Sequence, residues 1–169
     1  EVFYKASFNE AVVFVVFTNT LVLWPSLVAE IPCYNIPSLR DGDWWPLILL
    51  FVFAFSDVCG RFCVPYRLGL TKDNIYIPVL FRFILSVPLI VLLVQGTVPF
   101  FRNDIGSFIV VTAFGYTNGY LGSLSIVLTN EAVDYEDRGS VGTLTGFTLN
   151  AGLAVGSSLA VYIEKWFIG

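Results

Sequence analysis

The chain has 169 residues, of which 56% are hydrophobic and only 13% are charged, and its formal net charge is −4. A soluble domain carries about 25% charged residues, so this composition indicates a protein whose main solvent is lipid. The acidic balance excludes a nucleic-acid surface, which needs clustered Lys and Arg, and the absence of histidine removes the commonest catalytic base and zinc ligand.

Five apolar segments are each about as long as the roughly 20 helical residues that cross a bilayer. Short stretches rich in Pro, Gly and charge separate them, so the sequence predicts an all-α, polytopic membrane bundle with five transmembrane helices. The segments run approximately over residues 8–28, 44–62, 75–95, 105–129 and 141–163. Because the sequence contains no methionine and starts with Glu1, we expect a piece of a longer polypeptide, or alternatively a processed mature chain.

Basic residues near the ends of the segments predict an orientation, because Lys and Arg are more frequent on the cytoplasmic side. An alternating path places five of them on one side and three on the other, so we expect a cytoplasmic first residue and an external last residue. The first group is Lys5, Arg61, Arg67, Lys72 and Arg138, and the second is Arg40, Arg102 and Lys165.

The second segment ends in an acid and a base. In "FAFSDVCGR", Asp57 precedes Arg61 by four residues, which places both on one helix face. A lone charge inside the bilayer costs about 3 kcal/mol on insertion scales and needs a partner or water. Either the two side chains simply neutralise each other, or they line a watery path and offer a carboxylate and a guanidinium to a polar ligand. Sugar hydroxyls would suit the carboxylate of Asp57, and a planar acceptor would suit the guanidinium of Arg61.

The third segment carries another base within its expected membrane span. Arg82 lies at a depth similar to that of Asp57, because the two helices run in opposite directions and each group is ~10 Å from the cytoplasmic boundary. Pro88 follows and interrupts the backbone hydrogen bonds of the helix. We therefore expect Arg82 and Pro88 to have a gating or structural role rather than to contact a ligand.

The last two segments combine small and polar residues. "GYTNGYLGS" places Asn118 and Tyr120 in mid-membrane, where such groups either bond a neighbouring helix or line a cavity. Small residues that recur every fourth position let helix backbones approach closely. The glycines expected to pack in this way are Gly115, Gly119, Gly142, Gly146, Gly152 and Gly156.

The sequence predicts no enzyme, cofactor or metal site. Asp57 has no second membrane-embedded acid, as an intramembrane aspartyl protease would need, and metal-dependent or serine-type intramembrane proteases need histidine. No glycine-rich loop beside a lysine suggests nucleotide hydrolysis. Cys33, Cys59 and Cys63 have no metal-ligand spacing.

Several of these motifs together resemble the equilibrative nucleoside transporter family. "SDVCGR" (residues 56–61) resembles the D-x-x-G-R signature of the family's eighth transmembrane helix, and "GYTNGYLGSL" (residues 115–124) resembles its tenth. "RGSVGTLTGFTLNAGLAVGS" (residues 138–157) is similar to the eleventh, and "WPS" (residues 24–26) sits where the seventh has an aromatic–Pro–small turn. The arginine-then-proline pattern of the third segment suits the ninth.

The resemblance implies that residues 1–169 form the C-terminal transmembrane bundle, helices 7–11, of a carrier with a major-facilitator-like arrangement of six helices plus five. The six-helix N-terminal half would lie outside this chain. Asp57 and Arg61 would line the central cavity and bind the nucleoside, Asp57 through the ribose hydroxyls and Arg61 through the ribose or the base. Ala54 stands where many members carry Asn, which removes an amide from the cavity wall. The candidates for lining this cavity are Trp24, Ala54, Asn118 and Tyr120.

The function that we expect is facilitative transport of nucleosides or nucleobases by alternating access, most simply at the plasma membrane. The partners would be the small-molecule substrate, the lipid bilayer and the N-terminal half of the same transporter, without nucleic acid. Two alternatives stay open. The chain could belong to a non-transporting scaffold or assembly subunit whose ion pair is structural, or to a proton-coupled carrier of another small polar solute.

Overall fold

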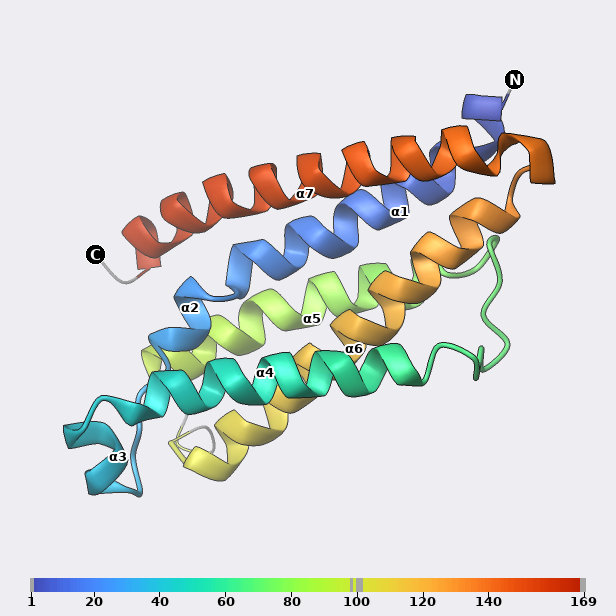
Figure 1. Cartoon of the computed structure of the whole chain (residues 1–169). Helices are drawn as coiled ribbons and strands as arrows, with labels where there is room; N and C mark the ends of the chain where they lie inside the picture. Colours follow the sequence, from blue (N-terminus) through green and yellow to red (C-terminus); the bar gives the residue numbers. More distant parts are fainter. Residues whose placement is uncertain (1, 98, 100–101, 168–169) are drawn as a thin grey trace.

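The computed structural model describes residues 2–97, 99 and 102–167 and contains only helices among them. Glu1, the expected fragment boundary, lies outside the described residues. The long helices run roughly along one direction (Figure 1). The elements in chain order are α1 (Val2–Leu23), α2 (Ser26–Ala29), α3 (Pro37–Asp41), α4 (Trp44–Phe62), α5 (Tyr76–Gln95), α6 (Asp104–Glu131), the 3₁₀ turn η2 (Tyr135–Asp137) and α7 (Arg138–Phe167).

Four of the described helical stretches are long and apolar enough to cross a membrane, which confirms the all-α membrane bundle. They are Ala6–Ala29, Trp44–Phe62, Tyr76–Gln95 and Tyr135–Trp166. The helix over the fourth expected segment, α6, has 28 residues but is not among these four. Its interspersed glycines and polar residues lower its mean hydropathy, so the count of five spans stays a prediction.

Helix ends follow local sequence signals. At the end of α5, Gly96 adopts the left-handed conformation (φ 56°), and its N–H bonds the Leu92 carbonyl at 3.1 Å. Asn103 caps α6, because its side-chain oxygen accepts from the Ile105 N–H at 3.0 Å. Pro88 lies inside α5, which continues beyond it to Gln95 as one helix.

Two helix pairs make the closest backbone contacts, α1 with α7 and α4 with α6 (Figure 1). A Cβ atom at Gly156 of α7 would lie 2.5 Å from the Thr18 carbonyl oxygen of α1. On α6, a Cβ atom at Gly119 would lie 1.9 Å from the Asp57 carbonyl oxygen of α4. These positions therefore need glycine for the helices to approach as they do.

The remaining expected packing glycines divide into two groups. Gly115 and Gly152 also sit against backbone, Gly115 against Phe53 of α4 and Gly152 against Phe14 of α1. Gly142 and Gly146 are exposed on α7, and a Cβ at Gly146 would meet nothing within 4 Å in the described chain. A Cβ at Gly142 would lie 3.8 Å from Asn130 Oδ1 of α6, so among the described residues only Gly146 of these two faces no neighbouring helix.

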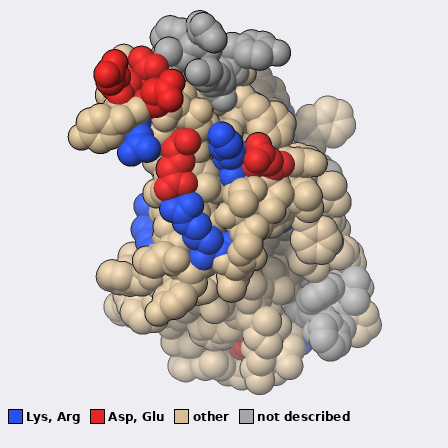
Figure 2. Space-filling view, turned by 90° about the vertical axis from the view of Figure 1, so that its right-hand side faces the viewer, with Lys and Arg blue, Asp and Glu red and all other residues tan. Residues whose placement is uncertain are grey.

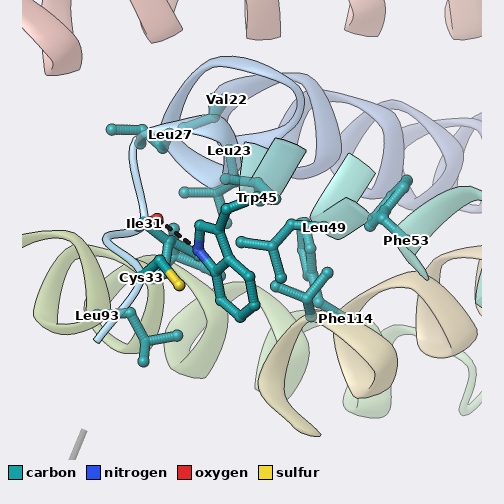
Figure 3. Close-up of a cluster of buried hydrophobic side chains, with 13 residues drawn as sticks. Val22, Leu23, Leu27, Ile31, Cys33, Trp45, Leu49, Phe53, Leu93 and Phe114 are labelled. Carbon is teal, nitrogen blue, oxygen red and sulfur yellow. Dashed lines mark hydrogen bonds between the residues drawn. The ribbon is translucent and has the colours of Figure 1, made fainter. Parts of the chain in front are cut away.

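The largest apolar cluster joins α1, α2, α4, α5 and α6 near the end of the bundle that holds α3 (Figure 3). Trp45 is central to it, and its indole N–H donates to the Ile31 carbonyl at 2.9 Å. Leu23, Leu49 and Leu93 in the same cluster are fully buried. This core fixes how α4 lies against α1 and α6, and so sets the position of the polar residues further along α4.

The N-terminus, residues 63–75 and the α6–α7 connection lie at the opposite end of the bundle (Figure 1). Figure 2 views this end and shows acidic and basic side chains gathered mostly in its upper part, above a largely uncharged surface. One pair is bidentate: Arg67 Nη1 and Nη2 lie 2.8 and 2.7 Å from the two carboxylate oxygens of Glu131. The loop after α4 is thereby tied to the end of α6.

Candidate functional site

Asp57 lies on the face of α4 that packs against α6, and the exposed fraction of its side chain is 13%. Both carboxylate oxygens have partners. Oδ2 accepts from Arg61 Nε at 2.7 Å, one helical turn along α4, and Oδ1 accepts from Asn118 Nδ2 of α6 at 2.7 Å. The contact with α6 is short because Gly119 lets the backbones touch at this level.

The side chain of Arg61 is more exposed than that of Asp57. The exposed fraction of the Arg61 side chain is 51%, although its Nε atom donates to the largely buried carboxylate of Asp57. In the described part of the chain no hydrogen bond leaves its two Nη groups. Asp57 and Arg61 are therefore not both buried. The Asp57 carboxylate faces the other helices, whereas the two Nη groups of Arg61 lie at the surface of the bundle, where they can donate hydrogen bonds to a ligand.

The side-chain amide of Asn118 links four helices next to this ion pair. Asn118 donates to Asp57, and its oxygen accepts from the Thr20 hydroxyl of α1 and from Arg82 Nη2 of α5 at 3.4 Å. Arg82 Nη2 also donates to Thr20 Oγ1 at 3.2 Å. The acid on α4 and the two bases, on α4 and α5, thus converge on one polar centre.

Arg82 is 7% exposed and holds neutral groups rather than a carboxylate. Its Nε donates to Thr117 Oγ1 at 3.2 Å, and its guanidinium lies 4.5 Å from the centre of the Phe114 ring. Nη1 is buried and has no acceptor among the described residues. Among the described residues its link to Asp57 runs through Asn118, so the arrangement contains no direct α4–α5 salt bridge.

The other expected cavity residues lie around this centre in different settings. Trp24 stacks on Phe53, with ring centroids 5.0 Å apart and planes 20° apart. Ala54, the residue after Phe53 and about one turn before Asp57 on α4, is exposed. Tyr120 is 7% exposed, and its hydroxyl donates to the Tyr66 carbonyl at 2.7 Å, which pins the loop after α4.

Two grooves border α6. A groove of about 570 Å³ between α5 and α6 is lined mainly by Leu, Phe and Ile, and its polar lining residues are Arg82, Ser86, Thr117 and Tyr120. A second groove, of about 730 Å³, lies between α4 and α6 and includes Ser56 and Tyr116. Neither of these two grooves has Asp57 or Arg61 among its lining residues.

Sequence reasoning missed the contribution of α1 to this centre. Thr20 reaches Asn118 and Arg82, and Asn19 Oδ1 accepts from the Ser86 hydroxyl of α5 at 3.1 Å. The signal was the polar run "TNT" (residues 18–20) in the middle of the first apolar segment. Such a run inside a membrane helix indicates bonds to neighbouring helices.

Comparison with known proteins gives a consistent result. The profile of the nucleoside transporter family matches residues 1–165. Equilibrative nucleoside transporter 2 of Homo sapiens is 30% identical over 165 residues, which cover 94% of this chain and 36% of the relative. Nucleoside transporter 1.2 of Leishmania donovani is 26% identical over 155 residues, covering 88% of this chain and 30% of the relative.

A plant relative has the same coverage. Equilibrative nucleotide transporter 1 of Arabidopsis thaliana is 28% identical over 148 residues, which cover 88% of this chain and 30% of the relative. The chain thus spans about a third of the length of the curated relatives that it matches. All three relatives are named as transporters.

Proposed function

This chain belongs to the nucleoside transporter family, and from that premise we propose that it forms one wall of the central cavity of a facilitative nucleoside carrier. The carrier would move nucleosides or nucleobases across the plasma membrane by alternating access. The other wall would come from the N-terminal half of the same transporter, because the matched relatives are about three times as long as this chain.

The observation that carries this proposal is that the two residues of the ion pair differ in exposure: Asp57 is largely buried and Arg61 is half exposed. Asp57 is fixed by Asn118 and Arg61 at 2.7 Å each, whereas half of the Arg61 side chain is open. A preorganised carboxylate beside a guanidinium with free donors suits a ligand that brings hydroxyls and a planar acceptor. In this proposal Asp57 binds the ribose hydroxyls, and Arg61 binds the ribose or the base.

Alternating access is consistent with the way the polar centre is built. Asn118 connects α1, α4, α5 and α6 through side chains that each have a defined partner. A ligand that competes for Asp57 or Arg61 would therefore alter contacts on four helices. Arg82 and Pro88 are in this proposal the elements that transmit the change, without contacting the ligand.

The test is uptake of a labelled nucleoside by the full-length carrier in cells without their own nucleoside uptake. We expect Asp57→Asn and Arg61→Ala each to abolish uptake while the amount of protein at the cell surface is unchanged. Arg40 and Asp41 form a matched control, because they are an exposed ion pair of the same residue types, 3.1 Å apart. Arg40→Ala and Asp41→Asn should leave uptake intact, and normal uptake by both site variants would refute the assignment.

One observation favours the second candidate, a membrane scaffold with a structural ion pair: both oxygens of Asp57 already have partners within the chain. That function predicts that exchanging the two residues (Asp57→Arg with Arg61→Asp) preserves assembly. It also predicts that no nucleoside raises the melting temperature of the purified protein. Stabilisation by a nucleoside that is lost in Asp57→Asn would exclude the scaffold.

A further inference from the structure

Thr20 is a buried residue of α1 whose hydroxyl lies among polar groups of three helices. Its Oγ1 atom is 2.9 Å from the Val16 carbonyl oxygen one turn back on α1 and 3.2 Å from Arg82 Nη2 of α5. It also donates to Asn118 Oδ1 of α6. A threonine that bonded only its own helix would make the first of these contacts alone. The other two indicate a role between helices.

Neither Thr20 nor Asn118 is placed to contact a ligand. They are 3% and 5% exposed, and neither is among the residues that line the two grooves beside α6. The side chains of Asp57 and Arg61 are 13% and 51% exposed. Any effect of Thr20 on a ligand in the proposed cavity therefore has to pass through this ion pair.

The neighbours of Asn118 allow one orientation of its amide group. Nδ2 donates to Asp57 Oδ1 at 2.7 Å, and Arg82 Nη2, which can only donate, lies 3.4 Å from Oδ1. Turning the amide over would direct its oxygen at the carboxylate and its NH₂ group at the guanidinium, so neither contact would be a hydrogen bond. A donor on Oδ1 therefore keeps Nδ2 directed at Asp57.

Thr20 is the main donor to this oxygen. Its Oγ1 atom lies closer to Asn118 Oδ1 than Arg82 Nη2 does, and closer than it lies to the Val16 carbonyl oxygen. The contact of Arg82 at 3.4 Å is longer than the usual range of about 2.7–3.2 Å for an N–H donor. Loss of the Thr20 hydroxyl would leave Oδ1 with this long contact alone, and the amide would be free to turn away from Asp57.

Asn118 in turn fixes the carboxylate of Asp57. The two donors to this carboxylate are Arg61 Nε and Asn118 Nδ2, each at 2.7 Å. Arg61 belongs to the same helix as Asp57 and is half exposed, whereas Asn118 is held by α1 and α5. The Asn118 contact is therefore the one that ties the carboxylate to the other helices. A carboxylate that is already oriented loses less freedom when a ligand binds, which strengthens binding.

We propose that Thr20 is a positioning residue for Asp57. Its hydroxyl donates to Asn118 Oδ1, which directs Nδ2 at Asp57 and holds the carboxylate in the orientation that accepts from the hydroxyls of the sugar. This inference rests on the proposed function, in which Asp57 binds the ribose. It adds that a residue of α1 without ligand contact sets how strongly a sugar with hydroxyls is preferred to one without them.

The test compares the binding of a nucleoside and of its 2′,3′-dideoxy analogue to the purified full-length carrier. Wild type should prefer the nucleoside. Thr20→Val keeps the shape of the side chain but has no hydroxyl, and it should reduce this preference by about fivefold. Thr20→Ser restores a hydroxyl and should keep the wild-type ratio. Thr129→Val is the matched control, because Thr129 is a fully buried threonine of α6 whose printed bond is to the Ser125 carbonyl of its own helix, at 2.8 Å.

The ratio of the two affinities separates positioning from packing. Thr20→Val and Thr129→Val both remove a buried hydroxyl and can both lower the melting temperature, but only Thr20→Val should change the ratio. If Thr20→Val does not fold, Thr20→Cys replaces it and should reduce the ratio less, because a thiol is a weak donor. A wild-type ratio in Thr20→Val, or in Thr20→Cys where that replaces it, overturns the proposal. So does a ratio in Thr20→Ser as low as that in Thr20→Val.

A second measurement does not depend on a ligand. In NMR spectra of the full-length carrier with isotope-labelled asparagine, the side-chain NH₂ signals of Asn118 are those that are missing in Asn118→Leu. They should shift in Thr20→Val but not in Thr20→Ser or Thr129→Val, and unshifted signals in Thr20→Val overturn the positioning. A wild type that binds both ligands equally contradicts the proposed function instead, and the NH₂ signals still decide the role of Thr20.

Discussion

At the scale of single residues, Asn118 determines the geometry of the polar centre. Its amide supplies a donor to Asp57 and an acceptor to Thr20 and Arg82, so each end of the group is used. A buried polar group that is left unpaired costs about 1–3 kcal/mol. From the sequence alone, Asn118 was equally compatible with bonding a neighbouring helix or lining a cavity, because its partners lie 36, 61 and 98 positions away.

A second residue-scale feature, the bidentate pair of Arg67 and Glu131, predicts a pH effect on stability. The hydrogen bonds from Arg67 hold the pKa of Glu131 below its ordinary value of 4.5. A carboxyl group whose pKa is lowered by folding stabilises the fold above that ordinary value, and the stabilisation is lost as the pH falls through the lower, folded-state pKa. Because both side chains are more than a third exposed, we expect a small effect.

The measurement is thermal unfolding of the purified full-length carrier as a function of pH. Wild type should melt slightly above Glu131→Gln at neutral pH, and the difference should disappear on acidification to about pH 3. A difference that grows on acidification would show that the sign of this interaction is wrong.

At the scale of elements, glycines set which helices pair. The fourth-residue pattern on α6 and α7 was visible in the sequence, but its meaning differs along the chain. Gly119 touches the backbone of α4. Gly146 belongs to a pattern with the same spacing on α7, but it faces away from the described helices. The rotation of each helix decides this, and rotation is set by packing of the whole bundle rather than by local spacing.

This difference predicts opposite outcomes for one substitution at two sites. Gly119→Ala would place its Cβ 1.9 Å from the Asp57 carbonyl oxygen, so α4 and α6 would have to separate. We expect a loss of several degrees in melting temperature and loss of uptake. Gly146→Ala has space in this half and should change the melting temperature of the bundle little. Equal melting temperatures for the two variants would contradict the packing described here.

At the scale of the whole molecule, hydropathy predicted the membrane bundle, and the order of motifs predicted the family. Helices α4 and α5 begin and end within one residue of the expected segments 44–62 and 75–95, where Pro, Gly and charge interrupt the apolar runs, whereas α1 covers 2–23 against the expected 8–28. Hydropathy underrates α6 because its glycines and polar residues serve contacts with α4, α1 and α5. The same residues that make α6 a centre of the site make it a weak hydropathy signal.

The surface beside the ion pair carries large exposed apolar side chains. Phe62, the next residue after Arg61, is 78% exposed, and Val58 is 47% exposed. Large apolar side chains beside a charged group favour a surface that a further part of the carrier covers. In the proposed carrier this is the N-terminal half, and the cavity for the nucleoside lies between the two.

The central claim is that Asp57 binds the hydroxyls of the sugar, and a ligand cycle tests it most directly. Equilibrium binding of a nucleoside and of its 2′,3′-dideoxy analogue would be measured on the purified full-length carrier, as wild type, Asp57→Asn and the control Asp41→Asn. Removing the hydroxyls should weaken binding by about tenfold or more in wild type and in Asp41→Asn, because hydrogen bonds to a charged group contribute about 1.5–3 kcal/mol. In Asp57→Asn the two ligands should bind almost equally. The same ratio of affinities in all three proteins would contradict the claim.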